Sequence, residues 1–169
     1  GKGTQCAKIV AEFGYTHLSA GDLLRAEVAR GSPDGQMIDS MIRNGQIVPV
    51  EVTLNLLKKA MDKNHATNKF LIDGFPRAID QAVAFEEQVG PCAFTLFLDC
   101  PEEIMRDRLL ERGKSSGRVD DNEATIVKRF KVFQMQSMPV VNYFSRRGRV
   151  KMIAATDSAD NHVRSRDEI

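Results

Sequence analysis

Short apolar runs alternate with segments of helical periodicity along this chain. Four runs predict strands, at residues 15–19, 69–73, 93–99 and 150–154. The second and third runs are almost continuously apolar, which is typical of parallel strands covered on both faces. They end in Asp73 and Asp99, at the edge where parallel sheets bind ligands.

Between these runs, apolar residues recur at the three- and four-residue spacing of helices. One helix is predicted at residues 78–89, where a Gly-Pro pair ends the pattern. A second is predicted to begin at Pro101 and to end at Gly113. The pattern Asp120-x-x-Glu123 predicts a capping box that opens a third helix.

Strands that alternate with helices predict an α/β fold with a mainly parallel sheet. Two segments interrupt this alternation. Residues 20–50 contain two helical patterns with no strand between them, and residues 113–121 are small and polar. We expect both segments to be mobile lobes over a cleft.

The composition fits one soluble globular domain and narrows the possible partners. The chain has 169 residues with 24 Lys and Arg against 23 Asp and Glu, a net charge of +1. This balance gives no general reason to expect binding to nucleic acid or membranes. The three cysteines form no CxxC pair and are expected to be reduced, and the three histidines show no ligand spacing.

The chain opens with GKGTQCAKIV, in which a Gly-Lys-Gly-Thr sequence leads into a predicted helix. Backbone N–H groups of a glycine-rich loop and of a helix N-terminus bind anions. Lys2 would add a full positive charge beside a phosphate. Taken alone, four residues are a weak signal, and an accidental glycine-rich end is the alternative.

The segment LIDGFPR at residues 71–77 adds a second feature at the ligand-binding edge. An acidic residue at a strand end can hold the water shell of Mg²⁺, which suits Asp73. An arginine can bind a phosphate through two hydrogen bonds, which suits Arg77. A turn with incidental charges is the alternative interpretation.

Several further arginines follow along the chain. For each one alone, a solvated surface charge is the more common role, yet phosphoryl transfer requires several cations around one charged group. The set comprises Arg25, Arg77, Arg108, Arg112, Arg118 and Arg129. No pair of residues suggests a nucleophile and its base, so the set favours phosphoryl transfer.

With these pieces in order, the chain resembles a nucleoside monophosphate kinase, most closely a short-lid eukaryotic adenylate kinase, with uridylate–cytidylate kinases as near relatives. The matching stretches are GKGTQ, HLSAGDLLR, NGQIVP, LIDGFPR with Gln81, and RGKSSGRVDDNEATIVKR. They keep the family's order and cover residues 1 to about 154. The resemblance implies a single domain over residues 1–169 with a P-loop-type parallel sheet flanked by helices, a monophosphate-binding lobe at 20–48 and a short lid at 112–122.

The resemblance also assigns site residues. The catalytic set would be Lys2, Arg77, Arg112, Arg118 and Arg129, and Asp73 would hold Mg²⁺ through water. ATP would be bound by Gly1, Lys2, Gly3, Thr4, Arg108 and Asp157. AMP would be bound by Ala20, Arg25, Gln46, Ile47, Val48, Gly74, Phe75, Pro76, Arg77, Gln81, Arg118 and Arg129. The Phe75-Pro76 peptide would be cis, as in the family.

Two positions bear on which base the acceptor nucleotide carries, and they favour different bases. Gln81 offers a donor and an acceptor, which suits the N1 and N6 edge of adenine, and adenylate kinases carry Gln here. Ala20 stands where adenylate kinases usually have Thr and pyrimidine kinases have Ala. We expect Gln81 to face the base directly, so AMP is the favoured acceptor over CMP or UMP.

The chain departs from the family pattern at both ends. The family's first strand and the opening of its phosphate loop would precede Gly1, so we expect the first strand to be missing. At the other end, Asp157 replaces a usual Gly, and the tail lacks the apolar stripe of the family's last helix. These departures motivate an alternative, an inactive nucleotide-binding protein.

The predicted function is therefore that of an adenylate kinase, transfer of the γ-phosphoryl group of ATP to AMP with Mg²⁺. A UMP/CMP kinase of the same fold is the alternative. Small-molecule nucleotides are the expected partners, and we expect a cytoplasmic monomer.

Overall fold

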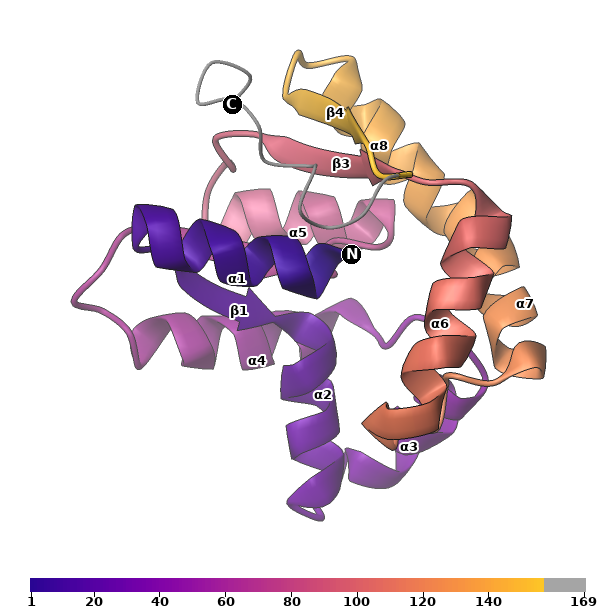
Figure 1. Ribbon diagram of the computed structural model, residues 1–169. Coiled ribbons are helices and arrows are strands. Elements are labelled where there is room, and N and C mark those ends of the chain that lie inside the picture. Colours follow the sequence, from indigo (N-terminus) through magenta and orange to yellow (C-terminus); the bar gives the residue numbers. More distant parts are fainter. Residues whose placement is uncertain (157–169) are drawn as a thin grey trace.

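The computed structural model describes residues 1–156 and is shown in Figure 1. It is a mixed α/β structure in which short parallel strands alternate with helices. The helices are α1 (Lys2–Phe13), α2 (Ala20–Ala29), α3 (Gly35–Arg43), α4 (Val50–Asp62), α5 (Ile79–Gln88), α6 (Glu102–Ser116), α7 (Glu123–Val132), the π-helical turn η1 (Phe133–Ser137) and α8 (Met138–Ser145). The strands are β1 (Thr16–Ser19), β2 (Phe70–Asp73), β3 (Thr95–Asp99) and β4 (Val150–Ala154).

The strands form two parallel pairs, which confirms the predicted class and strand direction. β1 pairs with β2, where Thr16 lies opposite Phe70, and β3 pairs with β4, where Thr95 lies opposite Val150. The expected single sheet is not continuous, because within residues 1–156 no hydrogen-bonded ladder joins the two pairs. No described strand lies between them to supply the backbone donors and acceptors that such a ladder needs.

The ends of β1 and β2 lead directly into the region of the predicted site. Ser19 and Asp73 are the last residues of the two strands and lie opposite each other. Ser19 is also the N-cap of α2, where its hydroxyl accepts a hydrogen bond from the Asp22 amide at 3.2 Å. The chain therefore passes from strand to helix without a loop, and this places the first turns of α2 beside the sheet edge.

The Gly-Lys-Gly-Thr sequence lies at the start of a helix rather than in a loop before it. Gly1 is the N-cap of α1, and the Gln5 amide donates to the Gly1 carbonyl at 3.1 Å. The amides of Lys2, Gly3 and Thr4 precede this first helical bond, so no carbonyl one turn back can accept from them. They are the groups that a helix N-terminus offers to an anion.

Two predicted boundaries around the lid are wrong. α6 continues through Gly113 to Ser116, so the first part of the predicted loop is helical. α7 is capped by Asn122, whose side chain accepts from the Thr125 amide at 3.0 Å, and not by Asp120. Asp120, the first acidic residue of the predicted capping box, is instead buried and accepts a hydrogen bond from Arg129.

Residues 50–62 and 133–145 form helices that the pattern analysis did not assign. The second of these segments changes from the π-helical turn η1 into α8, where Pro139 occupies the first turn. Proline is tolerated there because the first amides of a helix have no partner within it. The cis peptide expected at Phe75-Pro76 is present.

Two apolar clusters hold these elements together. One joins β1, α2, α4 and the turn after β2, and its buried members are Leu18, Ala20, Leu54, Leu57 and Phe75. The other joins α5 to α8 through Ala82, Val140 and Phe144. In Figure 1, α2 and α3 project below the strands, whereas α6 and α7 extend along the right-hand side.

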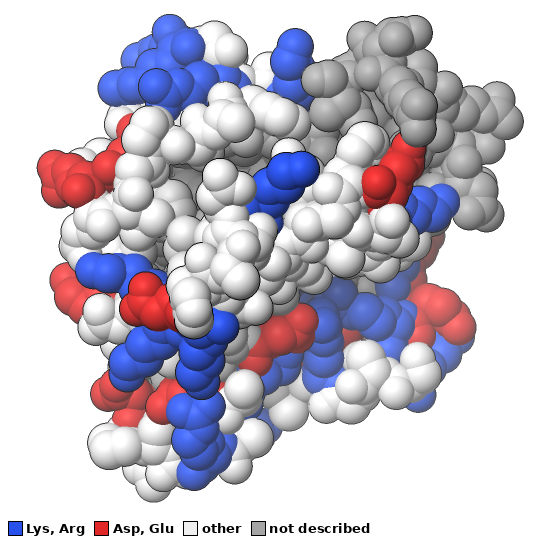
Figure 2. Space-filling model, turned by 90° about the vertical axis from the view of Figure 1, so that its left-hand side faces the viewer, with Lys and Arg blue, Asp and Glu red and all other residues white. Residues whose placement is uncertain are grey.

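Charged side chains of both signs share the surface. On the face shown in Figure 2, Lys and Arg lie next to Asp and Glu in the lower half, while uncharged side chains occupy most of the middle. Among residues 1–156, no helix has both the length and the apolar character that crossing a membrane requires.

Candidate functional site

Cationic side chains from distant parts of the chain converge beside the end of β2. The Lys2 ammonium lies within electrostatic reach of Asp73, Arg77 and Arg129. Although Lys2 is exposed as a residue, loss of hydration around its ammonium is the largest influence and lowers its pKa. Arg77 and Arg129 lower this pKa further, and Asp73 opposes them. Like charges that repel one another in this way form a site that favours an anion.

Arg77 is held by the turn that follows β2. Its Nε donates to the Gly74 carbonyl at 2.7 Å. Gly74 has φ of +74°, and a Cβ atom there would lie 3.0 Å from an Arg77 guanidinium nitrogen. Loss of hydration is the largest influence on the Arg77 guanidinium and lowers its pKa, and repulsion from Arg129 adds to this.

Two buried carboxylates position one arginine on α6 and one on α7. Asp121 accepts two hydrogen bonds from Arg112, at 2.7 and 2.6 Å, in the bidentate arrangement that favours strong pairing. Arg129 donates to Asp120 at 2.8 Å and lies 3.6 Å from Asp121. The sequence analysis missed both roles. The only signal was the pair of adjacent acids within an arginine-rich stretch.

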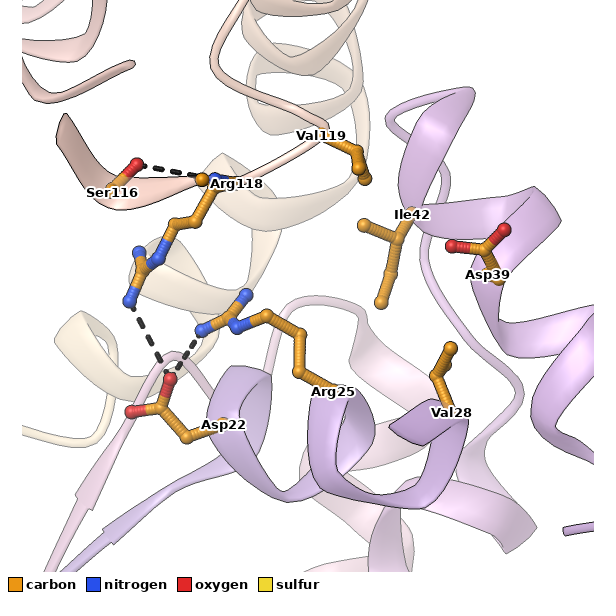
Figure 3. Close-up of a pocket in the computed structure, with 9 residues that line it drawn as sticks. Asp22, Arg25, Val28, Asp39, Ile42, Ser116, Arg118 and Val119 are labelled. Carbon is orange, nitrogen blue, oxygen red and sulfur yellow. Dashed lines mark hydrogen bonds and ion pairs between the residues drawn. The ribbon is translucent and has the colours of Figure 1, made fainter. Parts of the chain in front are cut away.

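A third acid joins the lid to the helical lobe. Asp22 on α2 contacts Arg25 at 2.5 Å and Arg118 at 3.4 Å, and Figure 3 shows both guanidinium groups directed at this carboxylate. These residues line a pocket of about 420 Å³ between α2, α3 and the lid. Arg25 and Arg118, both in the predicted AMP-binding set, are thus brought together by Asp22, a shared counter-ion that was not predicted.

The remaining pocket wall combines apolar side chains with the Asp39 carboxylate, which pairs with Arg43. Val28 and Ile42 from the lobe and Val119 from the lid lie on the side of the pocket away from Asp22 (Figure 3). A cavity that pairs cationic groups with an apolar wall suits a ligand with a charged end and a flat, less polar end.

The predicted base-reading residue Gln81 is almost fully buried, with 2% of its surface exposed. Its Oε1 accepts from the Arg77 amide at 2.9 Å, and its Nε2 donates to the Val48 carbonyl at 3.1 Å. These partners fix which end of the amide carries oxygen. One Nε2 hydrogen and one Oε1 lone pair remain for a further partner.

The other residues predicted to contact the acceptor nucleotide differ in their burial. Val48 and Ala20 are buried, with 4% and 2% of their surface exposed, whereas Gln46 is exposed and Ile47 is half-buried. Phe75 is in the core cluster at 9% exposure, so its side chain serves packing.

The donor side of the predicted site is described only in part. Arg108 donates to the Ala155 and Thr156 carbonyls at 2.9 and 3.0 Å, so its guanidinium lies against the end of β4. Asp157 lies outside the described residues.

Asp73 is the residue expected to hold Mg²⁺ through water, and its surroundings fit that expectation. Among residues 1–156, its buried Oδ1 has no hydrogen-bond partner, so an oxygen is available to accept from a coordinated water. Two other donors accompany it, since Cys6 and His17 place ligand atoms within 4.8 Å of one another and of this carboxylate. The sequence analysis assigned neither residue a role.

Comparison with known proteins identifies the family. The sequence model of a family described as adenylate kinase matches residues 1–149. The chain belongs to the adenylate kinase family.

Relatives of this adenylate kinase family member carry two kinds of name. The chain is 53% identical to a uridylate kinase of Saccharomyces cerevisiae, over 95% of this chain and 80% of the relative. It is 57% identical to UMP-CMP kinase 3 of Arabidopsis thaliana, over 92% of this chain and 76% of the relative. It is 50% identical to adenylate kinase 1 of Schistosoma mansoni, over 95% of this chain and 82% of the relative. The family resemblance inferred from the motifs is therefore confirmed.

The pairing of Arg112 with Asp121 makes the stability of the protein depend on pH. Burial by itself would raise the Asp121 pKa, but the Arg112 hydrogen bonds and the Arg112 and Arg129 charges outweigh it, so the pKa is lowered. A carboxyl group with a lowered folded-state pKa contributes stability above its unfolded pKa of about 3.9 and loses it as pH falls through the folded value.

We therefore expect Asp121→Asn to lower the free energy of unfolding by about 2 kcal/mol at pH 7, since hydrogen bonds to a charged group are lost. The gap between variant and wild type should shrink as pH falls below about 4. Urea unfolding from pH 7 to pH 3 measures both effects. Glu111→Gln is the control, because Glu111 forms an exposed pair with Lys114 and its loss should change little. A gap that stays constant with pH would contradict this account.

Proposed function

We propose that this nucleoside monophosphate kinase transfers the γ-phosphoryl group of ATP to AMP, giving two ADP. The observation that carries the proposal is the convergence of Lys2, Arg77 and Arg129, whose charges act on one another beside the end of β2. Cations held together against their own repulsion stabilise a transferring phosphoryl group as its charge spreads over the equatorial oxygens.

Each part of the site has a proposed role in this transfer. The first-turn amides of α1 and the Lys2 ammonium bind the donor phosphates. Arg25 and Arg77 hold the acceptor phosphate in line with them. Arg112, Arg118 and Arg129 take up the charge as it moves, and Arg108 lies against the donor base.

The carboxylates keep these arginines ready for the substrate. Asp120 and Asp121 orient Arg129 and Arg112 before any nucleotide is bound, so little reorganisation is needed during transfer. Asp22 satisfies Arg25 and Arg118 until a phosphate replaces it. Closure of the lid over the lobe would exclude water that otherwise hydrolyses ATP.

Asp73 would hold Mg²⁺ through a coordinated water. The bound ion would neutralise charge on the phosphates of ATP. The protein's own part is to present the buried Oδ1 of Asp73 beside the Lys2 ammonium.

The preference for AMP over UMP rests on the fixed amide of Gln81, and the preference for AMP over CMP rests on the resemblance to adenylate kinases, which carry Gln at this position. The Val48 carbonyl must receive an N–H, and the Arg77 amide must donate to an oxygen, so the amide cannot flip without losing both bonds. The remaining donor and acceptor match a base that presents a ring nitrogen acceptor beside an amino group. Adenine and cytosine both have an acceptor ring nitrogen beside a donor amino group, whereas uracil has a donor ring N–H beside an acceptor carbonyl oxygen.

A pyrimidine monophosphate is the second candidate acceptor. Ala20 is buried and supplies no hydroxyl to the pocket wall. The relatives named for uridylate or UMP-CMP are 53% and 57% identical, against 50% for the named adenylate kinase. A pocket that lacks one contact discriminates between two substrates by only about 1–3 kcal/mol. A pocket wall with Ala20 is therefore compatible with the use of both AMP and a pyrimidine monophosphate as acceptors.

The acceptor preference is tested by measuring kcat/KM with ATP and one of AMP, CMP, UMP or GMP. We expect AMP to be the best acceptor and CMP to exceed UMP by about tenfold, because the Gln81 amide order fits cytosine better. CMP and UMP form a matched pair that differs only at this edge of the base.

Each other result has a defined meaning. Preference for CMP or UMP over AMP would contradict the AMP assignment and support the second candidate. Equal values for CMP and UMP would remove Gln81 from base reading. No turnover with any acceptor would support the inactive nucleotide-binding alternative.

The monomeric state, the cytoplasmic location and the bounds of lobe and lid remain predictions.

A further inference from the structure

Three different ligand types meet where α1, β1 and β2 lie side by side. Cys6 comes from α1, His17 from β1 and Asp73 from the end of β2. One ligand atom from each residue lies within 4.8 Å of the other two, and the His17 Nε2 lies 3.7 Å from the Asp73 Oδ2. Pairing of β1 with β2 holds His17 and Asp73 in register, two positions apart along neighbouring strands.

Two polar atoms of this cluster have no hydrogen-bond partner within the described part of the chain. The His17 Nε2 and the Asp73 Oδ1 are both buried without a hydrogen-bond partner among residues 1–156. Cys6 is also buried, with 8% of its surface exposed. Buried polar atoms without partners are costly, so their placement together calls for a ligand that all three can bind.

The donor set indicates which ligand that is. Sulfur and imidazole nitrogen suit zinc, whereas magnesium prefers oxygen ligands alone. In a tetrahedral zinc site the donor atoms lie about 3.3–3.6 Å apart, given bond lengths of about 2.0–2.3 Å. The donor atoms, which lie within 4.8 Å of one another, therefore need to approach by about 1.5 Å at most, which side-chain rotation can supply.

We propose that Cys6, His17 and Asp73 bind one zinc-class divalent cation. These three ligands leave a fourth coordination position for water. On binding, the Cys6 Sγ–H bond breaks, the sulfur keeps the electron pair and bonds to the metal, and the proton passes to solvent.

The site shares Asp73 with the magnesium role proposed above. A zinc-class ion bound here would occupy the carboxylate that is proposed to accept from the water of Mg²⁺. It would also place a positive charge beside Lys2, whose ammonium is already repelled by Arg77 and Arg129. Zinc-class metals should therefore inhibit this chain rather than serve as its cofactor.

Burial of the thiol adds a requirement for binding. Desolvation and the nearby Asp73 charge raise the pKa of Cys6 to about 11, so the free site carries a protonated thiol. A coordinated thiol is deprotonated by the metal, so binding must displace this proton.

Metal binding itself is the test, and it does not depend on kinase activity. Co²⁺ is added to the whole wild-type chain, and the absorption spectrum is examined for the sulfur-to-cobalt charge-transfer band that only a thiolate ligand produces. We expect this band at one equivalent of metal, and Zn²⁺ should abolish it while Mg²⁺ should not. Absence of the band would overturn the proposal without any variant.

Variants then identify the ligands. Cys6→Ser and His17→Gln should each weaken Zn²⁺ affinity by about 100-fold or more, measured by competition with a chromophoric chelator. Cys92→Ser is the matched control, since Cys92 is a half-buried cysteine that contacts Thr95 instead, and it should bind as wild type does. Equal affinity in all three variants, or loss in Cys92→Ser, would contradict the assignment.

Discussion

Replacing Arg77 by alanine is expected to lower kcat about 10³-fold while leaving the fold intact. The guanidinium belongs to the converging cationic group and is repelled by Arg129 and partly neutralised by Asp73. Removal of one preorganised charge that acts on the transition state costs about 10²–10³ in kcat. The substitution removes the side-chain hydrogen bond to the Gly74 carbonyl, but it leaves the bonds of the Arg77 backbone to Gln81 and Ser137 in place, so the free energy of unfolding should change little.

Steady-state kinetics with ATP and AMP measure this effect, and circular dichroism during heating checks the fold. Arg30→Ala is the control, because the Arg30 side chain is 68% exposed and pairs only one helical turn away, with Glu27. The control should retain activity within a factor of two or so, as surface pairs contribute little. Near-normal turnover in Arg77→Ala would remove this arginine from the proposed mechanism.

Gly113→Ala is expected to destabilise the protein, the opposite of what this substitution does in most helices. Alanine is favoured over glycine within a helix by about 1 kcal/mol. Here, a Cβ atom would lie 2.6 Å from the Asp121 carbonyl oxygen, which is a backbone atom and cannot rotate away. Overpacking of this kind typically costs about 1–3 kcal/mol, which exceeds the gain in helix propensity, so we expect a net loss near 1 kcal/mol and a fall in Tm of about 2–4 °C.

A matched glycine provides the control. Gly35 lies at the start of α3, where a Cβ atom would meet its nearest neighbour, the Glu27 carbonyl, at an ordinary 3.4 Å. Gly35→Ala should therefore change Tm little. Gly113→Ala should also lower kcat, because displacement of Asp121 releases Arg112. A raised Tm in Gly113→Ala would show that the lid does not pack against α6 as described.

Local sequence was sufficient to predict the strands and the family. The runs ending in Asp73 and Asp99 are almost continuously apolar, and they form β2 and β3 with those residues as their last members. The cis peptide at Phe75-Pro76 also followed from the family motif. Such features depend on neighbouring residues, which a single sequence displays directly.

The pairing of charges could not be predicted in the same way. Asp120 lies where a capping box would place it, yet it bonds to Arg129, nine positions away. Asp22 and Arg118 are 96 positions apart, and only the packing of lobe and lid brings them together. The meeting of Cys6 with His17 likewise depends on how α1 crosses the sheet, so the spacing of cysteines and histidines gave no sign of it.

The structural role of Gly113 also depends on tertiary contacts, which the sequence does not display. A glycine at the end of an amphipathic pattern is a common stop signal, so the helix was predicted to end there. The helix instead continues to Ser116 and ends at Gly117, which has φ of +64°, whereas the lack of a side chain at Gly113 allows the close approach of the Asp121 backbone. The glycine thus marks a contact rather than a terminus.

The position of Asp22 makes the lid sensitive to ionic strength. Its side chain is 61% exposed, so its 3.4 Å pair with Arg118 is in contact with solvent and is weakened by salt. Concentrated salt should loosen this link between lid and lobe, whereas the contact of buried Asp121 with Arg112 should persist. Salt would thus shift the chain towards an arrangement in which lid and lobe are apart, while Arg112 stays paired with Asp121.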